Sequence, residues 1–397
     1  MHIHVIGAGV VGLTTAYYLI KKGYQVTIID QADSVAKGSS YANGGQLSYC
    51  LSDPLGKPNL FSKLPSLIFN SDPAIKFKPP KTFKSLDWSV RFLIECLKSR
   101  HKKNSLDLLE LALHSKLLLK EILLDIGPDF SYKKSSKIVL YENLNSFHQD
   151  SSFISEKNKM GSDNKILSMD DAINIEPAIE TLKGNFVGAI YSNSDEVGDS
   201  YLFCLNLYKW LLEQNTNFIF NSKVTKLNTN KNKISSLTLE SQELEVQNIV
   251  ICAGAISDKL VDTPVPIMPV KGYSLTLPKG QIEFSKSLTI ADKRMLLTRM
   301  GDKIRITGFA DFLNQDESKD KIRMNQLLDL AKDIAPCLAN YKSNNLVQWA
   351  GNRPLTPSSV PIIGPLHTKG VYVNSGQGFY GWTLACASGA RLAELFK

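Results

Sequence analysis

The chain has 397 residues, of which 43% are hydrophobic and 21% are charged, with a formal net charge of +8 and a pI of about 8.9. This length accommodates two domains, and the composition is that of an ordinary globular protein. The lack of any run of 18 apolar residues excludes a membrane-spanning helix, and the N-terminus does not resemble a signal peptide. The six cysteines and six histidines are scattered without a CxxC pair, which favours free thiols and no metal site.

The first thirty residues predict a strand, a helix and a second strand, joined by a glycine-rich turn. The strand covers 3–6, the helix covers 10–22, and the second strand covers 25–29. The turn follows the GxGxxG pattern, with the residues Gly7, Ala8, Gly9, Val10, Val11 and Gly12. The glycines allow a pyrophosphate to approach the backbone, where the helix N-terminus offers N–H groups and a positive dipole end. Asp30 then stands where an acid accepts ribose hydroxyls, so this unit predicts a dinucleotide site.

Three later features favour FAD over a nicotinamide dinucleotide. The loop 39–48 has small residues that allow a planar ring to approach the backbone. Residues 249–255 form an apolar strand that ends in a small turn, and residues 376–383 follow a strand and open a helix. The N-terminus of that helix would stabilise negative charge on the N1–C2=O edge of a reduced flavin. Each feature alone could also be an ordinary turn without a ligand. The preference for FAD therefore rests on the order of the three features along the chain.

The rest of the chain alternates between an α/β body and a sheet-rich lobe. We expect helices over 106–126, 200–214, 326–334 and 384–396, with Asp199 as the N-cap of the second. Strands are expected over 130–141, 218–220, 224–227, 234–239, 249–252 and 371–374. Antiparallel sheet is expected over 273–277, 295–298 and 304–307. The two kinds of segment interleave, which indicates domains that are discontinuous in sequence.

The segment 51–104 carries most of the net charge. It holds eleven Lys or Arg and four acids, which is +7 of the chain's +8. The charge is interleaved with a first apolar cluster of Leu60, Phe61, Leu64, Leu67, Ile68 and Phe69. A second set at helical spacing comprises Leu86, Val90, Leu93 and Leu97, beside Trp88, Phe92, Arg91 and Lys98. A basic amphipathic element with aromatics suits an anionic membrane surface, so we expect peripheral membrane contact and no nucleic acid. Alternatively, the apolar residues cover the protein body and the lysines are simply solvated.

These motifs together resemble the D-amino acid oxidase superfamily of flavoproteins, and within it the D-amino acid dehydrogenases. The matching stretches are VIGAGVVGLTTAYYL from Val5, SSYANGGQLS from Ser39, DEVGDSYLF from Asp195, KGYSLTLP from Lys271, GNRPLTPSSVPIIG from Gly351 and NSGQGFYGWTLACASG from Asn374. The resemblance implies an α/β fold: a Rossmann-like, three-layer FAD-binding domain with a discontinuous antiparallel-sheet (α+β) substrate domain. It assigns 1–50, 105–128, 190–256 and 345–397 to the former, 129–189 and 257–344 to the latter, and 51–104 to an insertion.

The resemblance also implies the residues of the site and a noncovalent FAD. The cofactor residues would be Gly7, Gly9, Val10, Val11, Gly12, Asp30, Ser39, Ser40, Asn43, Gly44, Gly45, Gln46, Val224, Ala253, Gly254, Gly376, Gly378, Phe379, Gly381, Trp382 and Thr383. Arg353 would grip the substrate carboxylate, because a guanidinium matches a carboxylate with two parallel N–H donors. Tyr273 would add a hydroxyl to that carboxylate or pack in the lobe, and Gln46 would contact flavin or substrate.

The implied reaction is the oxidative deamination of a D-amino acid. A hydride would pass from the substrate Cα to flavin N5, and the imino acid would hydrolyse to a 2-oxo acid and ammonia. A quinone-type acceptor would take the electrons, which places the protein in the cytoplasm, at the inner face of the cytoplasmic membrane. The side-chain preference is left open. The alternatives are a glycine or sarcosine oxidase, a D-proline or hydroxyproline dehydrogenase, an NAD-dependent dehydrogenase, and a non-catalytic FAD-binding subunit.

Overall fold

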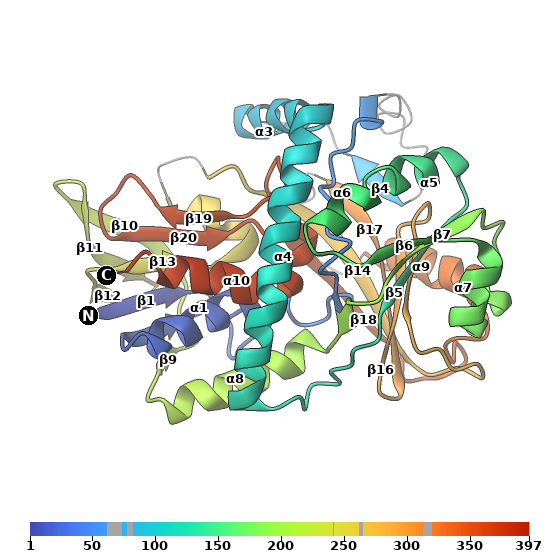
Figure 1. The fold of residues 1–397 in the computed structure, drawn as a ribbon. Helices are drawn as coiled ribbons and strands as arrows, with labels where there is room; N and C mark the ends of the chain where they lie inside the picture. The colour runs from blue at the N-terminus through green and yellow to red at the C-terminus, as the bar shows by residue number, and fades with distance from the viewer. Residues whose placement is uncertain (62–73, 78–81, 241, 262–264, 313–319, 397) are drawn as a thin grey trace.

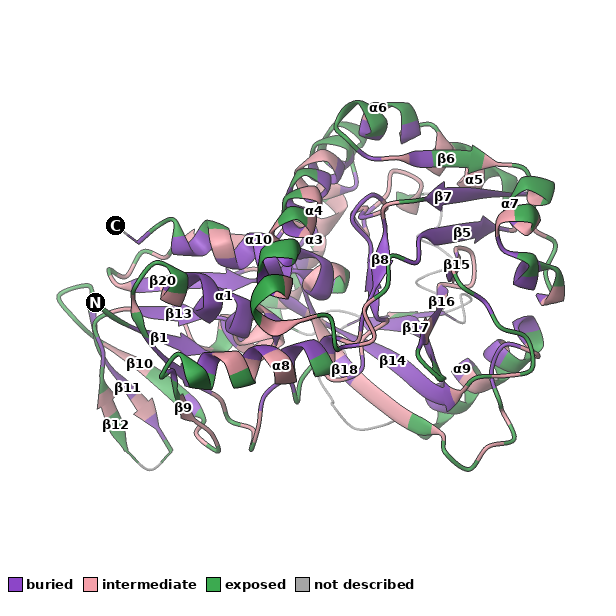
Figure 2. Cartoon of the chain, turned by 60° about the horizontal axis from the view of Figure 1, so that its bottom comes forward, coloured by how far each residue is buried: buried purple, intermediate pink, exposed green. Residues whose placement is uncertain are grey.

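A computed structural model describes residues 1–61, 74–77, 82–240, 242–261, 265–312 and 320–396. Its first body is built on a six-stranded sheet in the order β19-β20-β13-β1-β2-β9, which is parallel apart from β19 (Figures 1 and 2). The strands are β1 (His2–Ile6), β2 (Gln25–Ile29), β9 (Asn217–Ile219), β13 (Ile249–Ile251), β19 (Ile362–Pro365) and β20 (Val371–Ser375). The expected βαβ start is therefore confirmed.

Each face of this sheet is covered by a different layer, because successive strand residues point to opposite sides. Val5 packs into the core formed with the helices, whereas Ile6 packs toward the small sheet β10-β11-β12. The helices are α1 (Val10–Lys21), α4 (Lys98–Ile126), α8 (Ser200–Glu213) and α10 (Gly381–Ala393). The small sheet comprises β10 (Val224–Asn230), β11 (Lys233–Leu239) and β12 (Glu243–Glu245). The result is the three-layer arrangement expected for the cofactor domain.

The second body is a nine-stranded, mostly antiparallel sheet in the order β18-β14-β17-β16-β15-β5-β7-β6, with β4 added beside β17. Its strands are β4 (Ile75–Phe77), β5 (Lys137–Tyr141), β6 (Asn164–Leu167), β7 (Gly188–Ser192), β14 (Met268–Pro278), β15 (Ser287–Ile290), β16 (Met295–Met300), β17 (Lys303–Phe312) and β18 (Val347–Leu355). Helix α9 (Lys321–Ile334) packs against this sheet through Met324 and Leu327.

Shorter elements connect and flank the two bodies. They are β3 (Gln46–Leu47), β8 (Glu196–Val197), α3 (Phe83–Glu95), α5 (Leu144–Ser151), α6 (Ile154–Lys159), α7 (Met169–Ile175) and the 3-10 turns η1 (Pro177–Thr181), η2 (Gly254–Lys259) and η3 (Gly378–Tyr380). The strands β3 and β8 pair antiparallel and lie where the bodies meet. The expected cap of α8 is confirmed, because the Asp199 carboxylate accepts from the backbone N–H groups of Tyr201 and Leu202.

Several expected boundaries differ from the structure. The strand expected over 130–141 is limited to β5, because Ser131 and Ser136 have positive φ angles of 57° and 63° that interrupt extended backbone. Helix α4 starts at Lys98 instead of 106, where buried His101 and Asn104 bond to Gly56 and Glu95. Two strands also fall outside the expected domain ranges. The nine-stranded sheet includes β18, from 345–397, and β4, from the insertion.

Candidate cofactor and active site

A cavity of about 750 Å³ lies between the glycine turn and the inner face of the nine-stranded sheet. Most of the predicted site residues line it: Gly7, Gly9, Val10, Val11, Asp30, Ser39, Ser40, Asn43, Gly44, Gln46, Val224, Ala253, Gly254, Tyr273, Arg353, Gly378, Phe379, Gly381 and Trp382. The lining does not include Gly12, Gly45, Gly376 and Thr383. One cavity therefore brings together residues from both ends and the middle of the chain.

Two glycines of the turn, Gly7 and Gly12, are packed so tightly that a side chain would not fit at either position. Gly7 has a φ of 110°, and a Cβ there would lie 2.5 Å from the carbonyl oxygen of Cys252. A Cβ on Gly12 would overlap the carbonyl oxygen of Gly7. The first N–H of α1, from Val10, donates to the hydroxyl of Ser40 at 3.0 Å. The turn thus leaves an open backbone surface at a helix N-terminus, which fits the pyrophosphate of a dinucleotide.

Asp30 links the glycine turn to the turn after β2. Its Oδ2 accepts from the N–H of Ala8 at 2.6 Å, and its Oδ1 accepts from the N–H of Ala32 at 2.8 Å. Burial raises the pKa of this carboxyl group, while both backbone bonds lower it. A carboxylate oxygen has more than one lone pair, so Asp30 can hold the turn and still accept a ribose hydroxyl in the cavity.

Replacing Asp30 by Ala is expected to weaken FAD retention by about tenfold or more, because the turn loses two charge-assisted bonds and the ribose loses its acceptor. The measurement is the dissociation constant of FAD, from flavin fluorescence released on dilution. Asp33→Ala is the matched control, because Asp33 is exposed and its carboxylate pairs with Lys37 four residues on. Equal affinities in the two variants would remove Asp30 from the ribose site.

The small-residue loop 39–48 is held from both bodies. The carbonyl oxygen of Asn43 accepts from Nη1 of Arg305 on β17 at 2.9 Å. The Asn43 side chain accepts from the N–H of Gly45, whose φ is 70°. The N–H of Ser48 donates to Oγ1 of Thr383 in the first turn of α10 at 3.0 Å. The loop is therefore fixed along the cavity, where small residues allow a flat ring to approach the backbone.

The start of α10 forms another wall of the cavity. Gly376 and Gly378 have φ angles of 92° and 55°, and these conformations let the chain turn sharply from β20 into the helix. Trp382 anchors the first turn, because its indole N–H donates to the carbonyl oxygen of Gly198 at 3.1 Å. Gly381 and Trp382 of this turn line the cavity, so the positive dipole end of the helix faces it, which fits the pyrimidine edge of a flavin.

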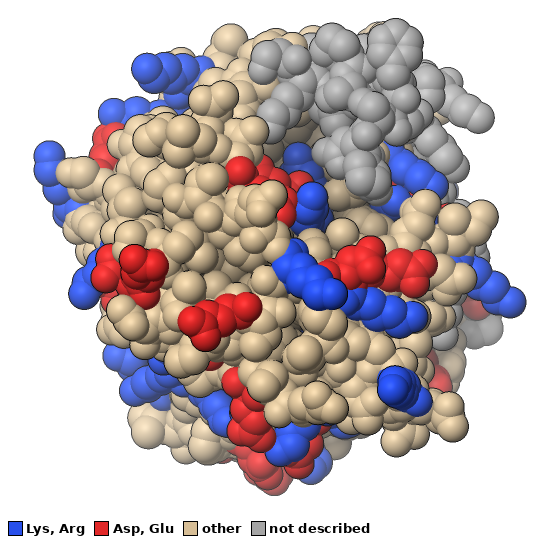
Figure 3. Space-filling view, turned by 90° about the vertical axis from the view of Figure 1, so that its right-hand side faces the viewer, with Lys and Arg blue, Asp and Glu red and all other residues tan. Residues whose placement is uncertain are grey.

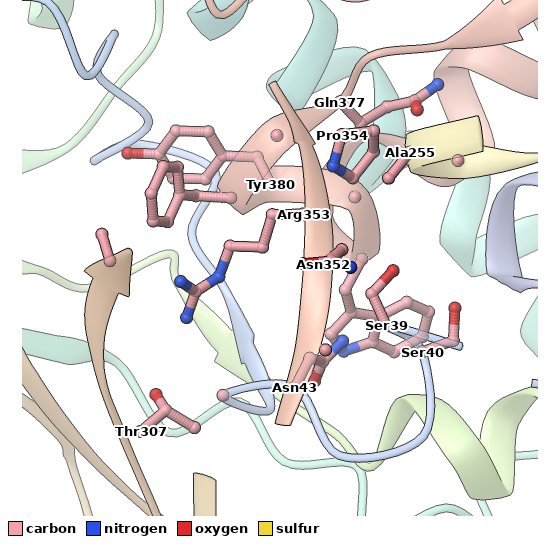
Figure 4. Close-up of a pocket in the computed structure, with 18 of the residues that line it drawn as sticks. Ser39, Ser40, Asn43, Ala255, Thr307, Asn352, Arg353, Pro354, Gln377 and Tyr380 are labelled. Atoms are coloured by element: carbon pink, nitrogen blue, oxygen red, sulfur yellow. The ribbon is translucent and has the colours of Figure 1, made fainter. Parts of the chain in front are cut away.

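Arg353 extends from β18 into the cavity between Tyr380 and Thr307, with Ser39, Ser40 and Asn43 on the nearby loop (Figure 4). Its Nη1 donates to the carbonyl oxygen of Phe309 at 3.0 Å, and its Cζ lies 4.7 Å from the centre of the Phe379 ring. A Cβ at Gly272 would overlap this guanidinium, so glycine provides its space. Burial lowers the pKa of Arg353 to about 10, which leaves it charged at neutral pH. A fixed, charged guanidinium here can bind a carboxylate.

Tyr273 is placed beside this group but is already bonded. Its hydroxyl donates to Oδ2 of Asp311 at 2.7 Å, and Asp311 pairs with the buried Arg323 at 2.6 Å. The hydroxyl has only one proton, so in this arrangement it cannot also donate to a substrate carboxylate. Its ring packs in the core of the lobe while also lining the cavity. Tyr273 therefore packs in the lobe and lines the cavity with its hydroxyl engaged by Asp311.

Several lining residues were missed by the sequence reading, including Lys137, Thr307 and Phe309. Lys137 opens an apolar strand, where a lysine usually marks the solvent end. Phe309 has a φ of 63° in a bulge of β17, and nothing in the sequence marks that conformation. The alternation of Lys137, Val139 and Tyr141 along one strand face is the one available signal.

Comparison with known proteins agrees with this geometry. "D-amino acid dehydrogenase" of Vibrio atlanticus is 32% identical over 405 residues, covering 100% of this chain and 95% of that protein. "D-amino acid dehydrogenase 2" of Ralstonia nicotianae is 32% identical over 410 residues, covering 100% and 96%. Among solved structures, glycine oxidase from Bacillus cereus has a TM-score of 0.75 at 18% identity, covering 99% of this chain and 94% of its own.

L-proline dehydrogenase from P. horikoshii has a TM-score of 0.76 at 18% identity, covering 100% of this chain and 93% of its own. These likenesses confirm the fold class. The DAO family, described as FAD dependent oxidoreductase, matches residues 2–395. With the glycine turn, Asp30 and the start of α10 arranged around one cavity, the cofactor is FAD, and the chain belongs to the DAO family of FAD-dependent oxidoreductases.

Proposed function

We propose that this protein is a D-amino acid dehydrogenase, which oxidises a D-amino acid to a 2-oxo acid and ammonia. The observation that carries the proposal is Arg353, a half-buried and charged guanidinium in the same cavity as the cofactor residues. The full-length relatives named D-amino acid dehydrogenase support this choice of substrate.

The protein's part in the reaction is to hold the substrate. Arg353 donates two parallel N–H bonds to the carboxylate, which fixes the direction of the Cα–H bond. Bound FAD supplies the acceptor for the hydride at N5. Phe309 and Phe379 hold the guanidinium from two sides, so its position does not depend on the substrate. The imino acid product hydrolyses after release.

We also propose that FAD is held without a covalent bond. All six cysteines are free, and Cys386 is buried within α10. Cys252 lines the cavity, but its thiol donates to the hydroxyl of Thr15 at 3.8 Å, and burial raises its pKa to about 12. No histidine occurs among the described residues of the lining. The flavin should therefore leave the protein on acid precipitation.

Anaerobic bleaching of the flavin tests the substrate assignment. The protein is mixed with D- and L-amino acids, glycine, sarcosine, D-proline and hydroxyproline, and the flavin absorbance is followed. D-amino acids with a primary amine should reduce the flavin fastest. Faster reduction by glycine or a secondary amine would identify another amine oxidoreductase, and a flavin that no amine reduces would indicate a non-catalytic subunit.

We further propose that the protein docks on a membrane surface through α3. Its electrons then pass to a quinone-type acceptor in that membrane. The helix lies at the top of the molecule beyond the end of α4 (Figure 1). Phe83 is 85% exposed, Leu86 is 50% exposed and Val90 is 49% exposed, and Ile94 and Leu97 continue this apolar face. Among the described residues, no helix has the length and apolar character needed to span a bilayer. Surface docking of an amphipathic helix is the contact that such a face supports.

On the other side of α3, the apolar residues cover the protein body, as the alternative interpretation of this segment expected. Trp88 is buried, its indole N–H donates to the carbonyl oxygen of Leu355 at 3.1 Å, and its ring stacks on Phe92. Leu64, Leu67, Ile68 and Phe69 lie outside the described residues. The face shown in Figure 3 carries Lys and Arg side chains interspersed with Asp and Glu. A face of mixed charge is not attracted strongly to an anionic membrane, so α3 is the better docking surface.

A double substitution, Leu86→Glu and Val90→Glu, should abolish co-sedimentation with anionic vesicles at low salt, since it places acids on the apolar face. Leu124→Glu is the control, because Leu124 is 88% exposed on α4, away from this face. Flavin reduction by substrate should stay unchanged in both variants. No vesicle binding by the unmodified protein, together with fast peroxide production in air, would contradict the proposal.

A further inference from the structure

Trp349 on β18 differs from the other three tryptophans in its surroundings. The indole N–H groups of Trp88 and Trp382 donate to backbone carbonyls, and Trp210 packs on the ring of Tyr17. Within the described part of the chain, the Trp349 indole makes no hydrogen bond or aromatic contact and belongs to no hydrophobic cluster. It is half-buried and lines the cavity. A large apolar side chain in this setting offers its surface to a ligand.

The indole ring extends along β18 toward the carboxylate clamp. Residues two apart on a strand point to the same face, so Trp349, Gly351 and Arg353 share one face of β18. A Cβ on Gly351 would lie 2.0 Å from Cη2 of Trp349. The ring therefore covers the space above Gly351, the residue between Trp349 and Arg353 on this face.

A pair of glycines fixes how close the ring is to the guanidinium. Gly351 pairs with Gly272 on β14, and a Cβ on Gly272 would lie 2.1 Å from Cζ of Arg353. The Cβ positions of directly opposed residues are about 4.5–5.5 Å apart, so Cη2 of Trp349 and Cζ of Arg353 are at most about 10 Å apart. A substrate carboxylate on the guanidinium places Cα on the order of 5 Å from Cζ. A side chain of about two to four carbons can then reach the indole.

This face of the sheet is the one that points to the cofactor loop. Ser274 on β14 lies opposite Trp349 on one side and opposite Thr307 of β17 on the other, so the three side chains share a face. Thr307 lines the cavity, and a Cβ on Gly44 of the cofactor loop would lie 3.1 Å from its Oγ1. The indole therefore lies on the side of the sheet where the flavin binds.

The surroundings of the indole suit an apolar group. Its neighbours on this face of β14 and β17, Gly272, Ser274 and Thr307, carry no charge that could match a charged side chain. On the guanidinium itself lies the ring of Phe379, which is 38% exposed and lines the same cavity. The carboxylate clamp thus stands between two aromatic rings, and an apolar substrate side chain gains by leaving water for their surfaces.

We infer that Trp349 is a wall of the pocket for the substrate side chain and selects D-amino acids with apolar or aromatic side chains. The indole contacts the side chain while Arg353 holds the α-carboxylate. The inference rests on the proposed function, because it assumes that Arg353 binds the α-carboxylate of a D-amino acid.

The first test compares substrates that differ in the side chain. D-phenylalanine and D-leucine should show a kcat/KM about tenfold above that of D-alanine, whose methyl group is too short to cover the indole. Trp349→Ala should lower kcat/KM for the first two by about ten- to a hundredfold and leave D-alanine nearly unchanged. Trp349→Phe should restore much of the loss, because it keeps an aromatic surface. Val347→Ala is the control, because Val347 is 52% exposed at the outer end of β18.

The second test measures binding without turnover. In the oxidised holoenzyme, 3-phenylpropanoate should perturb the flavin spectrum with a lower dissociation constant than propanoate, and Trp349→Ala should remove this difference. If no D-amino acid reduces the flavin, the proposed function fails, and the comparison of the two carboxylates still decides the role of Trp349. Equal binding of both carboxylates by the unmodified protein, or an equal loss for D-alanine and D-phenylalanine in Trp349→Ala, would overturn the inference.

Discussion

Arg353→Lys is expected to lower kcat/KM for D-amino acids by about ten- to a hundredfold, mainly through a higher KM. An ammonium group cannot reproduce two parallel N–H bonds, and loss of one charge-assisted bond costs roughly 1.5–3 kcal/mol. The shorter side chain also loses the contacts with the Phe309 carbonyl and the Phe379 ring. Steady-state kinetics and anaerobic flavin reduction measure the effect.

The control for Arg353 is Arg391→Lys. Arg391 is half-exposed on α10 and pairs with Glu110, so its replacement removes a surface contact of the same type. Its kinetics should match those of the unmodified protein. Wild-type kinetics in Arg353→Lys would mean that another group binds the carboxylate, and Arg353 would then be removed from the site.

Gly12→Ala is expected to release FAD and to lower the melting temperature. The added Cβ would overlap the carbonyl oxygen of Gly7, and Gly7 cannot move away because it packs against Cys252. Overpacking of this kind typically costs about 1–3 kcal/mol. Thermal unfolding with and without added FAD separates the loss of cofactor from the loss of fold stability.

Gly364→Ala provides the comparison for Gly12. Gly364 lies on β19 of the same sheet, and a Cβ there would meet no atom within 4 Å. This variant should keep its flavin and its melting temperature. If Gly12→Ala bound FAD as tightly as Gly364→Ala, close contact between helix and glycine turn would not be what shapes the pyrophosphate site.

The parts of the fold that rest on local signals were predictable from the sequence. The βαβ unit follows from the GxGxxG turn and Asp30, and the Asp199 cap follows from its position before an apolar helical pattern. The 106–126 helix was placed too short, because side-chain bonds of His101 and Asn104 hold its first turns. Such bonds depend on partners far away in sequence.

The residues of the candidate site also separate into those that a local sequence motif predicts and those that depend on the folded structure. Arg353 was found because it sits in a recognisable motif. Lys137 was missed because its burial arises only when β5 pairs with β15 and the loop 46–48 packs across them. The expected amphipathic character of α3 is confirmed by its exposed apolar face, but Trp88 belongs to the inward side of the helix. Single-sequence periodicity cannot distinguish which apolar residues a neighbouring strand will cover.

The bulge at Phe309 means that Arg353 is oriented during folding and not during substrate binding. A non-glycine residue at a φ of 63° costs about 1–3 kcal/mol, and the surrounding β17 and the Arg323–Asp311 pair hold it there. That conformation points the Phe309 carbonyl at Arg353. The guanidinium is therefore oriented when the chain folds, so a substrate loses little of its binding energy to ordering a flexible side chain.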